Sequence, residues 1–454
     1  MQDIIEHIGG SRSRYLEELK ELLRIESVSA DPDRKGELER CALHLRDALR
    51  EMGLEADLHS RGGNPIVLAR WMGARGKPTL LLYGHYDVQP PEPLEAWKSP
   101  PFEPEVRDGN IYARGASDDK GQLFCHIRAA EAFLARRGSL PLNLIFLIEG
   151  EEEVGSPSLG PFIHEEKEGL RAQVCAISDG VQFAPGLPAI TYGLRGILYV
   201  ELLLEGPSHD LHSGSFGGTI ANPANELSAL IASLKDESGR VTVKGFYDEV
   251  ESLSEEERKM LRELPFEEEA YREGLGVKAL SGERGFTTLE RRWARPTLDV
   301  NGIWGGYMGP GSKTIIPARA GAKLSMRLVP HQEPEKIAGL LEAHLKGLCP
   351  PGLELTFSAH HASRPYKAAL DSPGILAAKR ALEKGFGREP VMIREGGSIP
   401  IVSTIACELG IEPILMGFGL PDDSPHGPNE KLCLEDFYRG IMASSYLMEE
   451  VSKV

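Results

Sequence analysis

Cysteine is scarce in this sequence, and the few cysteines are far apart. Six occur among 454 residues, the first at Cys41 and the last at Cys433, and no C-x-x-C pair is present. This spacing excludes a zinc knuckle and a dithiol redox motif. Thiols distributed in this way are typical of reduced, mostly buried cysteines in a cytosolic protein.

Positive charge is also scarce. The chain has 51 Lys and Arg residues against 68 Asp and Glu residues, for a formal net charge of −17. Nucleic acids and anionic membrane surfaces attract basic proteins, so this balance argues against both as partners. The simplest consequence of the negative charge is solubility.

Long apolar runs are missing as well. No run approaches the roughly 18 apolar residues of a membrane span, and the first residues lack the basic and apolar regions of a signal peptide. Hydrophobic residues make up 41 % of the chain and charged residues 26 %, close to the averages of globular proteins. We therefore expect a cytoplasmic protein with no membrane partner, and its length predicts two domains.

Short apolar runs alternate with helical patterns in the first part of the chain. After two amphipathic helices in the first 60 residues, the runs lie at residues 79–83, 144–148 and 174–177, with a helical stretch at 122–137. This alternation predicts an α/β domain with a mostly parallel, buried sheet and helices on both faces. Ligands of such sheets gather beyond the carboxyl ends of the strands.

A second pattern begins near residue 196. Its elements follow the order β-α-β-β-α-β, which is the split βαβ arrangement. We expect them at residues 197–204, 227–234, 298–303, 322–329, 337–348 and 353–357. An acidic, helix-prone insertion at about 247–295 has no assigned chemistry, because such stretches are usually solvated. The second domain is therefore predicted at 196–363, inserted in a first domain made of 1–195 and 364–454.

The strongest local signal is Gly84-His85-Tyr86-Asp87, directly after the run at 79–83. If the strand continues, His85 and Asp87 project to the same side. A histidine with a carboxylate beside it matches a metal ligand and the group that orients it. A histidine hydrogen-bonded in a turn at the end of the strand is the alternative.

Acidic clusters follow two other elements. Asp118 and Asp119 open the predicted helix, where they could also act as N-terminal caps. Residues 149–153 contain four glutamates at the end of a predicted buried strand, where carboxylates repel one another unless cations or protons compensate. A solvated loop is the alternative for these glutamates.

Two weaker signals are Asp179, at the end of the run at 174–177, and His426 in Asp-Asp-Ser-Pro-His-Gly. A strand-end aspartate alone is more often a turn residue. The joint placement of all these clusters favours one crevice holding a metal. Two histidines with several carboxylates suit Zn²⁺, Mn²⁺ or Co²⁺.

Signatures of other enzymes are absent. His164-Glu165 begins like H-E-x-x-H, but Glu168 occupies the place of the second histidine. Neither a G-x-S-x-G elbow nor a P-loop occurs.

Nine short motifs occur in an order that resembles the M20 metallopeptidases, and within them the cytosolic non-specific dipeptidase and carnosinase-like branch. They span nearly the whole chain, and they are GHYDVQP, ARGASDDKG, EGEEEVGS, ISDG, DLHSGSFGG, GSKTIIPA, SMRLVP, REGGSIP and DDSPHGPNEK. The resemblance implies a peptidase that uses two divalent ions per subunit to hydrolyse dipeptides or similar small substrates.

The resemblance also implies roles for the clustered residues. Asp118 would bridge both ions, and its peptide bond to Asp119 is commonly cis in this family. Glu152 would be the general base that activates the attacking water. The remaining ligands would be His85 and Asp179 for one ion, and Glu153 and His426 for the other. Asp87 would support His85.

The predicted second domain is similar to the family's lid, which also forms the interface of a homodimer. His212 matches a lid histidine that reaches the partner's active site and stabilises the developing oxyanion. Arg327 would bind the terminal carboxylate of the substrate, assisted by Thr314 and Ser398.

Two other functions remain to be weighed. An N-acyl amino acid amidohydrolase, such as a deacetylase or desuccinylase, or a carboxypeptidase would share the same fold, but Gln89 and the DLHSGSFGG motif favour the dipeptidase branch. A catalytically inactive binding protein would lack a ligand or the base, and here every expected position is filled.

Overall fold

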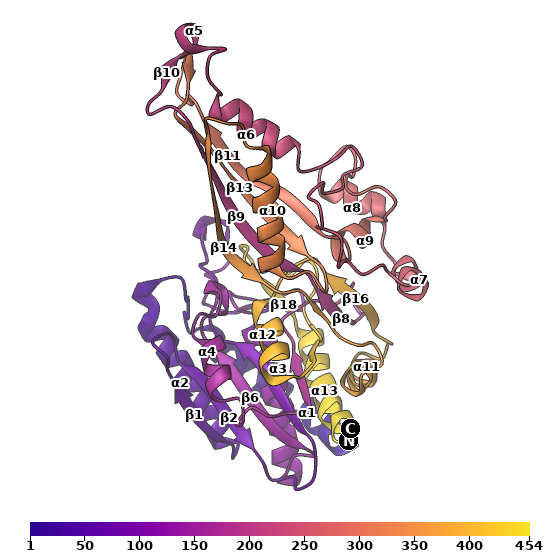
Figure 1. The fold of residues 1–454 in the computed structure, drawn as a ribbon. Coiled ribbons are helices and arrows are strands. Elements are labelled where there is room, and N and C mark those ends of the chain that lie inside the picture. The colour runs from indigo at the N-terminus through magenta and orange to yellow at the C-terminus, as the bar shows by residue number, and fades with distance from the viewer. The chain divides into compact units, whose positions relative to one another are not determined.

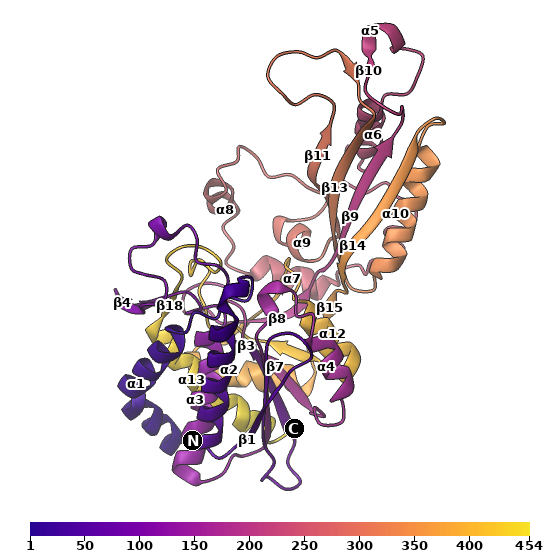
Figure 2. The ribbon, with the colours of Figure 1, turned by 90° about the vertical axis from the view of Figure 1, so that its left-hand side faces the viewer.

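The computed structural model describes residues 1–454, and the chain divides into two compact units. The first unit is made of Met1–Tyr192, Ala368–Ile393 and Thr404–Val454. The second unit is made of Gly193–Lys367 and Arg394–Ser403. Figures 1 and 2 show the ribbon from two directions, and each unit is described here by itself.

A large mixed sheet forms the centre of the first unit. Its path includes β1-β2-β6-β3-β7-β17-β8. The strands are β1 (Glu55–His59), β2 (Ile66–Trp71), β3 (Thr79–His85), β6 (Asn143–Glu149), β7 (Val174–Ile177), β8 (Ala189–Leu194) and β17 (Pro413–Leu415). All seven residues of β3 and all four of β7 are buried, which explains their continuous apolar sequences.

The sheet is mixed rather than mostly parallel as predicted. Parallel pairing is found at its centre, where β3 pairs with β6 and β7, and β17 pairs with β7. The pairs β1 with β2, β2 with β6, and β17 with β8 are antiparallel. Only residues 60–65 separate β1 from β2, too few for the crossover that a parallel pair needs.

Helices cover both faces of this sheet. Figure 2 shows α1 (Gln2–Leu23), α2 (Lys35–Glu51), α3 (Lys120–Arg137) and α13 (Leu434–Val451) on one side, and α4 (Leu159–Glu165) on the other. The connections explain this arrangement. In the strand order β6-β3-β7, the chain first moves from β3 through α3 to β6 on one side of β3. It then moves across the sheet in the opposite direction, from β6 through α4 to β7 on the other side of β3. Right-handed crossovers in opposite directions place their helices on opposite faces.

The remaining elements of the first unit are short, apart from one helix. Helix α11 (Pro373–Phe386) packs against α13. A three-stranded sheet has the order β18-β5-β4, from β4 (Glu105–Arg107), β5 (Asn110–Tyr112) and β18 (Lys431–Cys433). Single 3₁₀ turns lie at Pro32–Arg34, Leu94–Ala96 and Glu152–Val154. All six cysteines are free, and none of the helices combines the length and apolar character of a bilayer span.

The second unit is built on a four-stranded antiparallel sheet with the order β11-β13-β9-β14. Its main elements run β9 (Gly196–Glu205), α6 (Pro223–Ala232), β11 (Thr297–Gly305), β13 (Arg319–Leu328), α10 (Pro334–Leu348) and β14 (Glu354–Ser363). This is the β-α-β-β-α-β order predicted from the sequence. One face packs on α6 and α10 around a core that includes Leu202, Leu324 and Leu341.

Smaller elements complete the second unit. Strand β10 (Leu211–His212) pairs with β12 (Ile315–Ile316), and α5 (Ser213–Phe216) follows β10. The acidic stretch at 247–295 forms three short helices, as its helix-prone sequence indicated: α7 (Glu255–Glu263), α8 (Glu268–Gly274) and α9 (Thr288–Trp293). Capping boxes at Ser254 and Thr287 begin α7 and α9. Strands β15 (Tyr366–Lys367) and β16 (Val391–Glu395) and helix α12 (Pro400–Leu409) lie where the chain passes between the units.

Candidate metal centre

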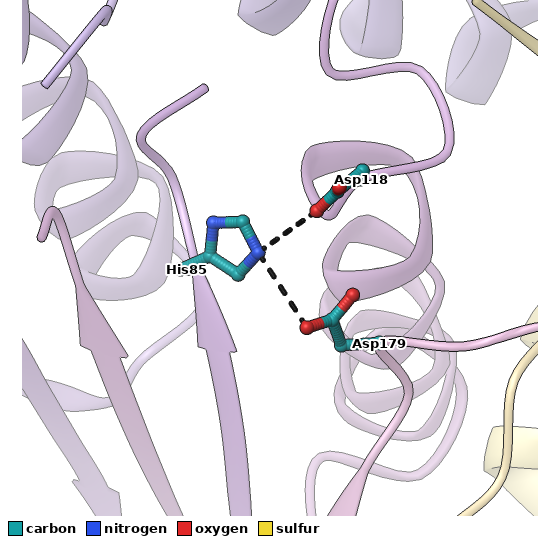
Figure 3. Close-up of side chains that lie close together, drawn as sticks. All are labelled: His85, Asp118 and Asp179. Carbon is teal, nitrogen blue, oxygen red and sulfur yellow. Dashed lines mark ion pairs between the residues drawn. The ribbon is translucent and has the colours of Figure 1, made fainter. Parts of the chain in front are cut away.

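His85 ends β3 and is fully buried. Its Nδ1 lies 3.0 Å from the main-chain oxygen of Asp87. Because a carbonyl oxygen only accepts, Nδ1 must donate, which leaves Nε2 as the atom available to a ligand. That Nε2 lies 3.1 Å from Asp118 Oδ1 and 3.8 Å from Asp179 Oδ2, as Figure 3 shows. A proton or a metal cation is required between these groups.

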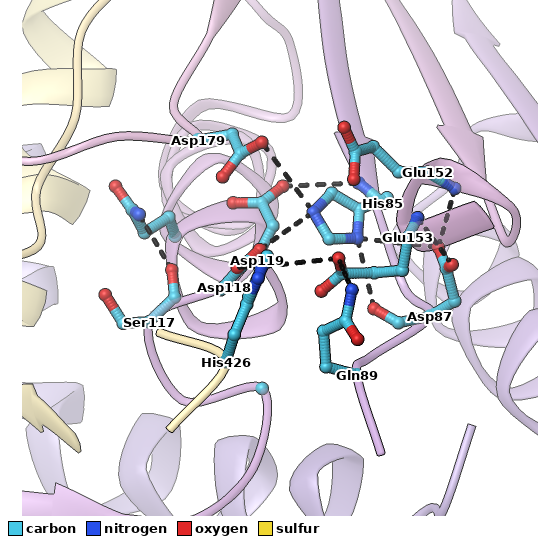
Figure 4. A network of polar contacts seen from close by, with 12 residues as sticks. His85, Asp87, Gln89, Ser117, Asp118, Asp119, Glu152, Glu153, Asp179 and His426 are labelled. Carbon is cyan, nitrogen blue, oxygen red and sulfur yellow. Dashed lines mark hydrogen bonds and ion pairs between the residues drawn. The ribbon is translucent and has the colours of Figure 1, made fainter. Parts of the chain in front are cut away.

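Asp118 lies between two groups of side chains. Its Oδ2 is 2.9 Å from Nε2 of His426, whose Nε2 is also 3.3 Å from Glu153 Oε2. Two sets of ligand atoms therefore gather within 4.8 Å, one from His85, Asp118 and Asp179, the other from Asp118, Glu153 and His426. Figure 4 shows both sets meeting at Asp118.

The two glutamates are held by Asp87. Its carboxylate accepts hydrogen bonds from the main-chain N–H groups of Glu152, at 3.2 Å, and Glu153, at 3.1 Å, where a 3₁₀ turn begins. Gln89 Nε2 donates to Glu153 Oε2 at 2.7 Å. The Glu152 carboxylate makes no hydrogen bond to the protein, although Figure 4 places it beside His85. The site therefore contains one unengaged carboxylate next to the ligand groups.

Electrostatics at this site favour a bound cation. Burial, with the charge of Asp118, raises the pKa of Glu153 to about 8 and that of Asp179 to about 7. Burial also raises the pKa of Glu152. The hydrogen bond to Asp118 raises the pKa of His426 to about 9. These carboxylates crowd together more negative charge than the site can hold ionised, and divalent cations would remove that penalty.

The donor set fits such cations. Imidazole nitrogens and carboxylate oxygens without thiolates suit Zn²⁺, Mn²⁺ or Co²⁺. Although Asp118 Oδ1 lies 3.1 Å away, the buried Nε2 of His85 makes no hydrogen bond of good geometry, which is expected of an atom reserved for a metal. With an unengaged carboxylate beside the cluster, this is the arrangement of a metal-dependent hydrolase.

Several neighbouring residues were not given roles from the sequence. The hydrogen bond that Gln89 donates to Glu153, and those that the main-chain N–H groups of Glu152 and Glu153 donate to Asp87, depend on loop geometry. Asp119 Oδ2 accepts from the main-chain N–H of His85 at 3.2 Å, and the Asp118-Asp119 peptide is cis, as the resemblance implied. Glu149 accepts from Tyr83 Oη at 2.6 Å and from Ser156 Oγ at 2.7 Å. The position of Glu149 at the end of β6 is the feature of the sequence that could have indicated a role for it near the site.

The second unit holds the other predicted site residues, and it separates them. Arg327 Nη1 donates to Ser398 Oγ at 2.8 Å, so these two lie together. Thr314 lies beside Ser213, whose N–H donates to its carbonyl oxygen, and His212 is exposed in β10. Eight residues of β13, about 26 Å of strand, separate Arg327 from the end near β12. Within one chain, His212 and Thr314 are therefore far from Arg327.

The comparison with known families agrees with the site. The model of the Peptidase family M20/M25/M40 matches residues 81–450. That range is well over half of the chain, so the protein belongs to this family.

Relatives of similar length support the same assignment. The Beta-Ala-His dipeptidase of Homo sapiens is 34% identical over 476 residues, covering 100% of this chain and 93% of the relative. The Cys-Gly metallodipeptidase of Schizosaccharomyces pombe is 33% identical over 470 residues, covering 100% and 99%. The solved structure of an M20 family metallo-carboxypeptidase from Sulfolobus solfataricus is 35% identical with a TM-score of 0.85, covering 97% of this chain and 99% of that one.

Proposed function

We propose that this protein hydrolyses the peptide bond of dipeptides or short peptides, with two divalent cations held by the clustered residues of the first unit. The observation that carries the proposal is that two groups of ligand atoms share Asp118. His85 and Asp179 would complete the site of one ion, and Glu153 and His426 that of the other. Dipeptidase relatives that align with the whole chain support the substrate class.

Glu152 is the proposed general base. When bound, a pair of divalent cations lowers the pKa of the water between them and polarises the scissile carbonyl. The Glu152 carboxylate is held in place through its main chain by Asp87 and makes no competing hydrogen bond. It is therefore free to take a proton from the attacking water and to deliver it to the leaving amine.

Arg327 is the proposed partner of the substrate's terminal carboxylate. Its Nη1 is oriented by Ser398, whose hydroxyl donates in turn to the main-chain oxygen of Arg195 at 2.6 Å. No carboxylate lies within ion-pair distance of Arg327, and a guanidinium can bind a carboxylate through two parallel hydrogen bonds.

A homodimer through the second unit is the proposed assembly. Strand β11 is an edge strand, and its Val300 and Ile303 side chains are 43% and 56% exposed. An exposed apolar edge of this kind is a suitable surface for a second copy of the chain to pack against. The separation of His212 and Thr314 from Arg327 in one chain supports a role for His212 in the partner's site, where it would stabilise the oxyanion.

The six free cysteines support a cytoplasmic location.

A substrate panel tests the proposed activity. The purified protein, with and without a chelator, is offered free dipeptides, N-acetyl and N-succinyl amino acids, and longer peptides. We expect hydrolysis of dipeptides that stops on chelation and returns with Zn²⁺, Mn²⁺ or Co²⁺. Hydrolysis of the N-acyl compounds alone would contradict the proposal.

A carboxypeptidase is the second candidate, because the aligned structure from Sulfolobus solfataricus carries that name. It predicts that peptides of four or more residues lose their C-terminal residue as fast as dipeptides are cleaved. Rates that fall steeply with chain length would favour the dipeptidase.

A further inference from the structure

Glu430 is a buried carboxylate that touches the loop of Asp118. Its side chain is 0% exposed and accepts four hydrogen bonds. The donors are Arg114 Nη1 at 2.8 Å and the main-chain N–H groups of Gly115 at 3.0 Å, Ser117 at 2.8 Å and Asp118 at 3.0 Å. Both of its oxygens are occupied by these donors, so Glu430 has no contact left for a metal.

Glu430 lies in the same loop as His426, four residues further along the chain. A second carboxylate of that loop, Asp423, accepts from Ser117 Oγ at 3.1 Å. Two acidic side chains from one end of the chain therefore fasten the loop at 114–118, which carries Asp118. In this way two segments about 300 residues apart in sequence are brought together at the metal ligands.

The hydrogen bonds explain how Asp118 is placed. Three main-chain N–H groups that converge on one carboxylate form charge-assisted bonds, which are stronger than neutral ones. Replacing the acceptor would leave buried N–H groups and the Arg114 guanidinium without a partner, which is costly. The loop would then move to regain partners, and the Asp118 carboxylate would move with it.

We propose that Glu430 is a positioning residue that fixes Asp118 between the two metal sites, so that the affinity for both ions depends on a carboxylate that touches neither. This inference rests on the proposed function. Because Asp118 belongs to both ligand groups, its displacement weakens both sites together. A substitution at a ligand that belongs to only one group would weaken mainly the binding of one ion.

Glu450 provides a matched control. Its side chain is also buried and accepts from Arg380 Nε at 2.7 Å, Lys384 Nζ at 2.6 Å and Lys453 Nζ at 2.8 Å. It joins α11 to α13 and makes no contact with the metal ligands. Glu450→Gln therefore removes the charge of a buried, multiply bonded carboxylate without touching the Asp118 loop.

The experiment measures metal affinity rather than activity. Wild type, Glu430→Gln, Glu430→Asp and Glu450→Gln are titrated with Zn²⁺ against a chromophoric chelator, and the thermal unfolding of each metal-free protein is recorded. We expect both ions to bind about 10- to 100-fold more weakly to Glu430→Gln. Glu430→Asp keeps the charge and should lie between. Glu450→Gln should lower the unfolding temperature but keep wild-type affinities.

The outcomes separate this inference from the proposed function. A wild-type protein that binds fewer than two ions would overturn both. A wild type that binds two ions, with Glu430 variants of unchanged affinity or weakened at one ion only, would overturn the positioning role and leave the proposed function in place. If Glu430→Gln does not fold, the Glu430→Asp titration decides by the same criteria.

Discussion

The two units organise their candidate functional residues in opposite ways. In the first unit, imidazoles and carboxylates from β3, from the loops after β5, β6 and β7, and from the loop before β18 meet in one cluster. In the second unit, Arg327 with Ser398 and His212 with Thr314 lie at opposite ends of a sheet. Under the proposed function, the first arrangement would need only its cations, whereas the second would form a site only if two chains assemble.

This difference has a physical cause. Parallel strands end at one edge of a sheet, so the residues that follow β3, β6 and β7 must be neighbours. An antiparallel sheet such as that of the second unit sends successive loops to opposite ends. The comparison is sharpened by four substitutions, described from the largest expected effect to the smallest.

Replacing the proposed general base should have the largest effect. Glu152→Gln keeps the size of the side chain but removes its proton acceptor, so kcat should fall by about 10²- to 10⁴-fold. Steady-state kinetics on a dipeptide, with metal content measured in parallel, checks this. Full metal content is expected, and wild-type turnover would exclude Glu152 as the base.

Removing the exposed histidine of the second unit should have a comparable but smaller effect. His212→Ala should lower kcat by about 10²-fold or more, if its imidazole stabilises the oxyanion. Mixing it with Glu152→Gln should restore activity, because the heterodimer contains one intact site. Random exchange predicts about a quarter of wild-type activity. If subunit exchange is verified and activity does not recover, His212 does not act in the partner's site.

Arg327→Lys should act on substrate binding. A lysine keeps the charge but loses the two parallel hydrogen bonds, so kcat/KM should fall about tenfold, mainly through KM. Dipeptide amides, which lack the terminal carboxylate, should be cleaved equally by both proteins. An equal loss on both substrates would instead indicate a structural defect.

Thr287→Ala should have the smallest effect. Thr287 caps α9 in the second unit by accepting from Glu290 N–H, and losing such a cap costs about 1 kcal/mol. Chemical denaturation should report that loss, with unchanged metal affinity of the first unit. A drop in metal affinity would show that the effect of this cap is not confined to the stability of α9.

Much of the first unit could be predicted from sequence because strand-end positions are visible in the apolar pattern. His85 follows the run at 79–83 and Asp179 the run at 174–177, and both lie in the cluster. The hydrogen bonds of Asp87, Gln89 and Glu430 could not be predicted in this way. They depend on how loops from distant parts of the chain fold against one another. The periodicity of apolar residues does not predict such contacts.

Strand direction was also beyond the apolar pattern. The three runs predicted as strands, at 79–83, 144–148 and 174–177, are β3, β6 and β7, which pair in parallel. The antiparallel strands β1 and β2 were not predicted, and β1 has no continuous apolar run because Glu55, Asp57 and His59 alternate with apolar residues. In the second unit the order of elements was predictable, because alternating strands and amphipathic helices carry different periods. The distance between His212 and Arg327 depends on where β10 lies along the sheet relative to Arg327 in β13, and the order of elements does not give this.

The most direct test of the metal centre is a crystal structure of the Mn²⁺-loaded protein with anomalous scattering measured at the manganese edge. The account predicts two anomalous peaks per chain, one beside His85 and Asp179 and the other beside Glu153 and His426, with Asp118 between them. Peaks elsewhere, or a single peak that Asp118 does not contact, would contradict it.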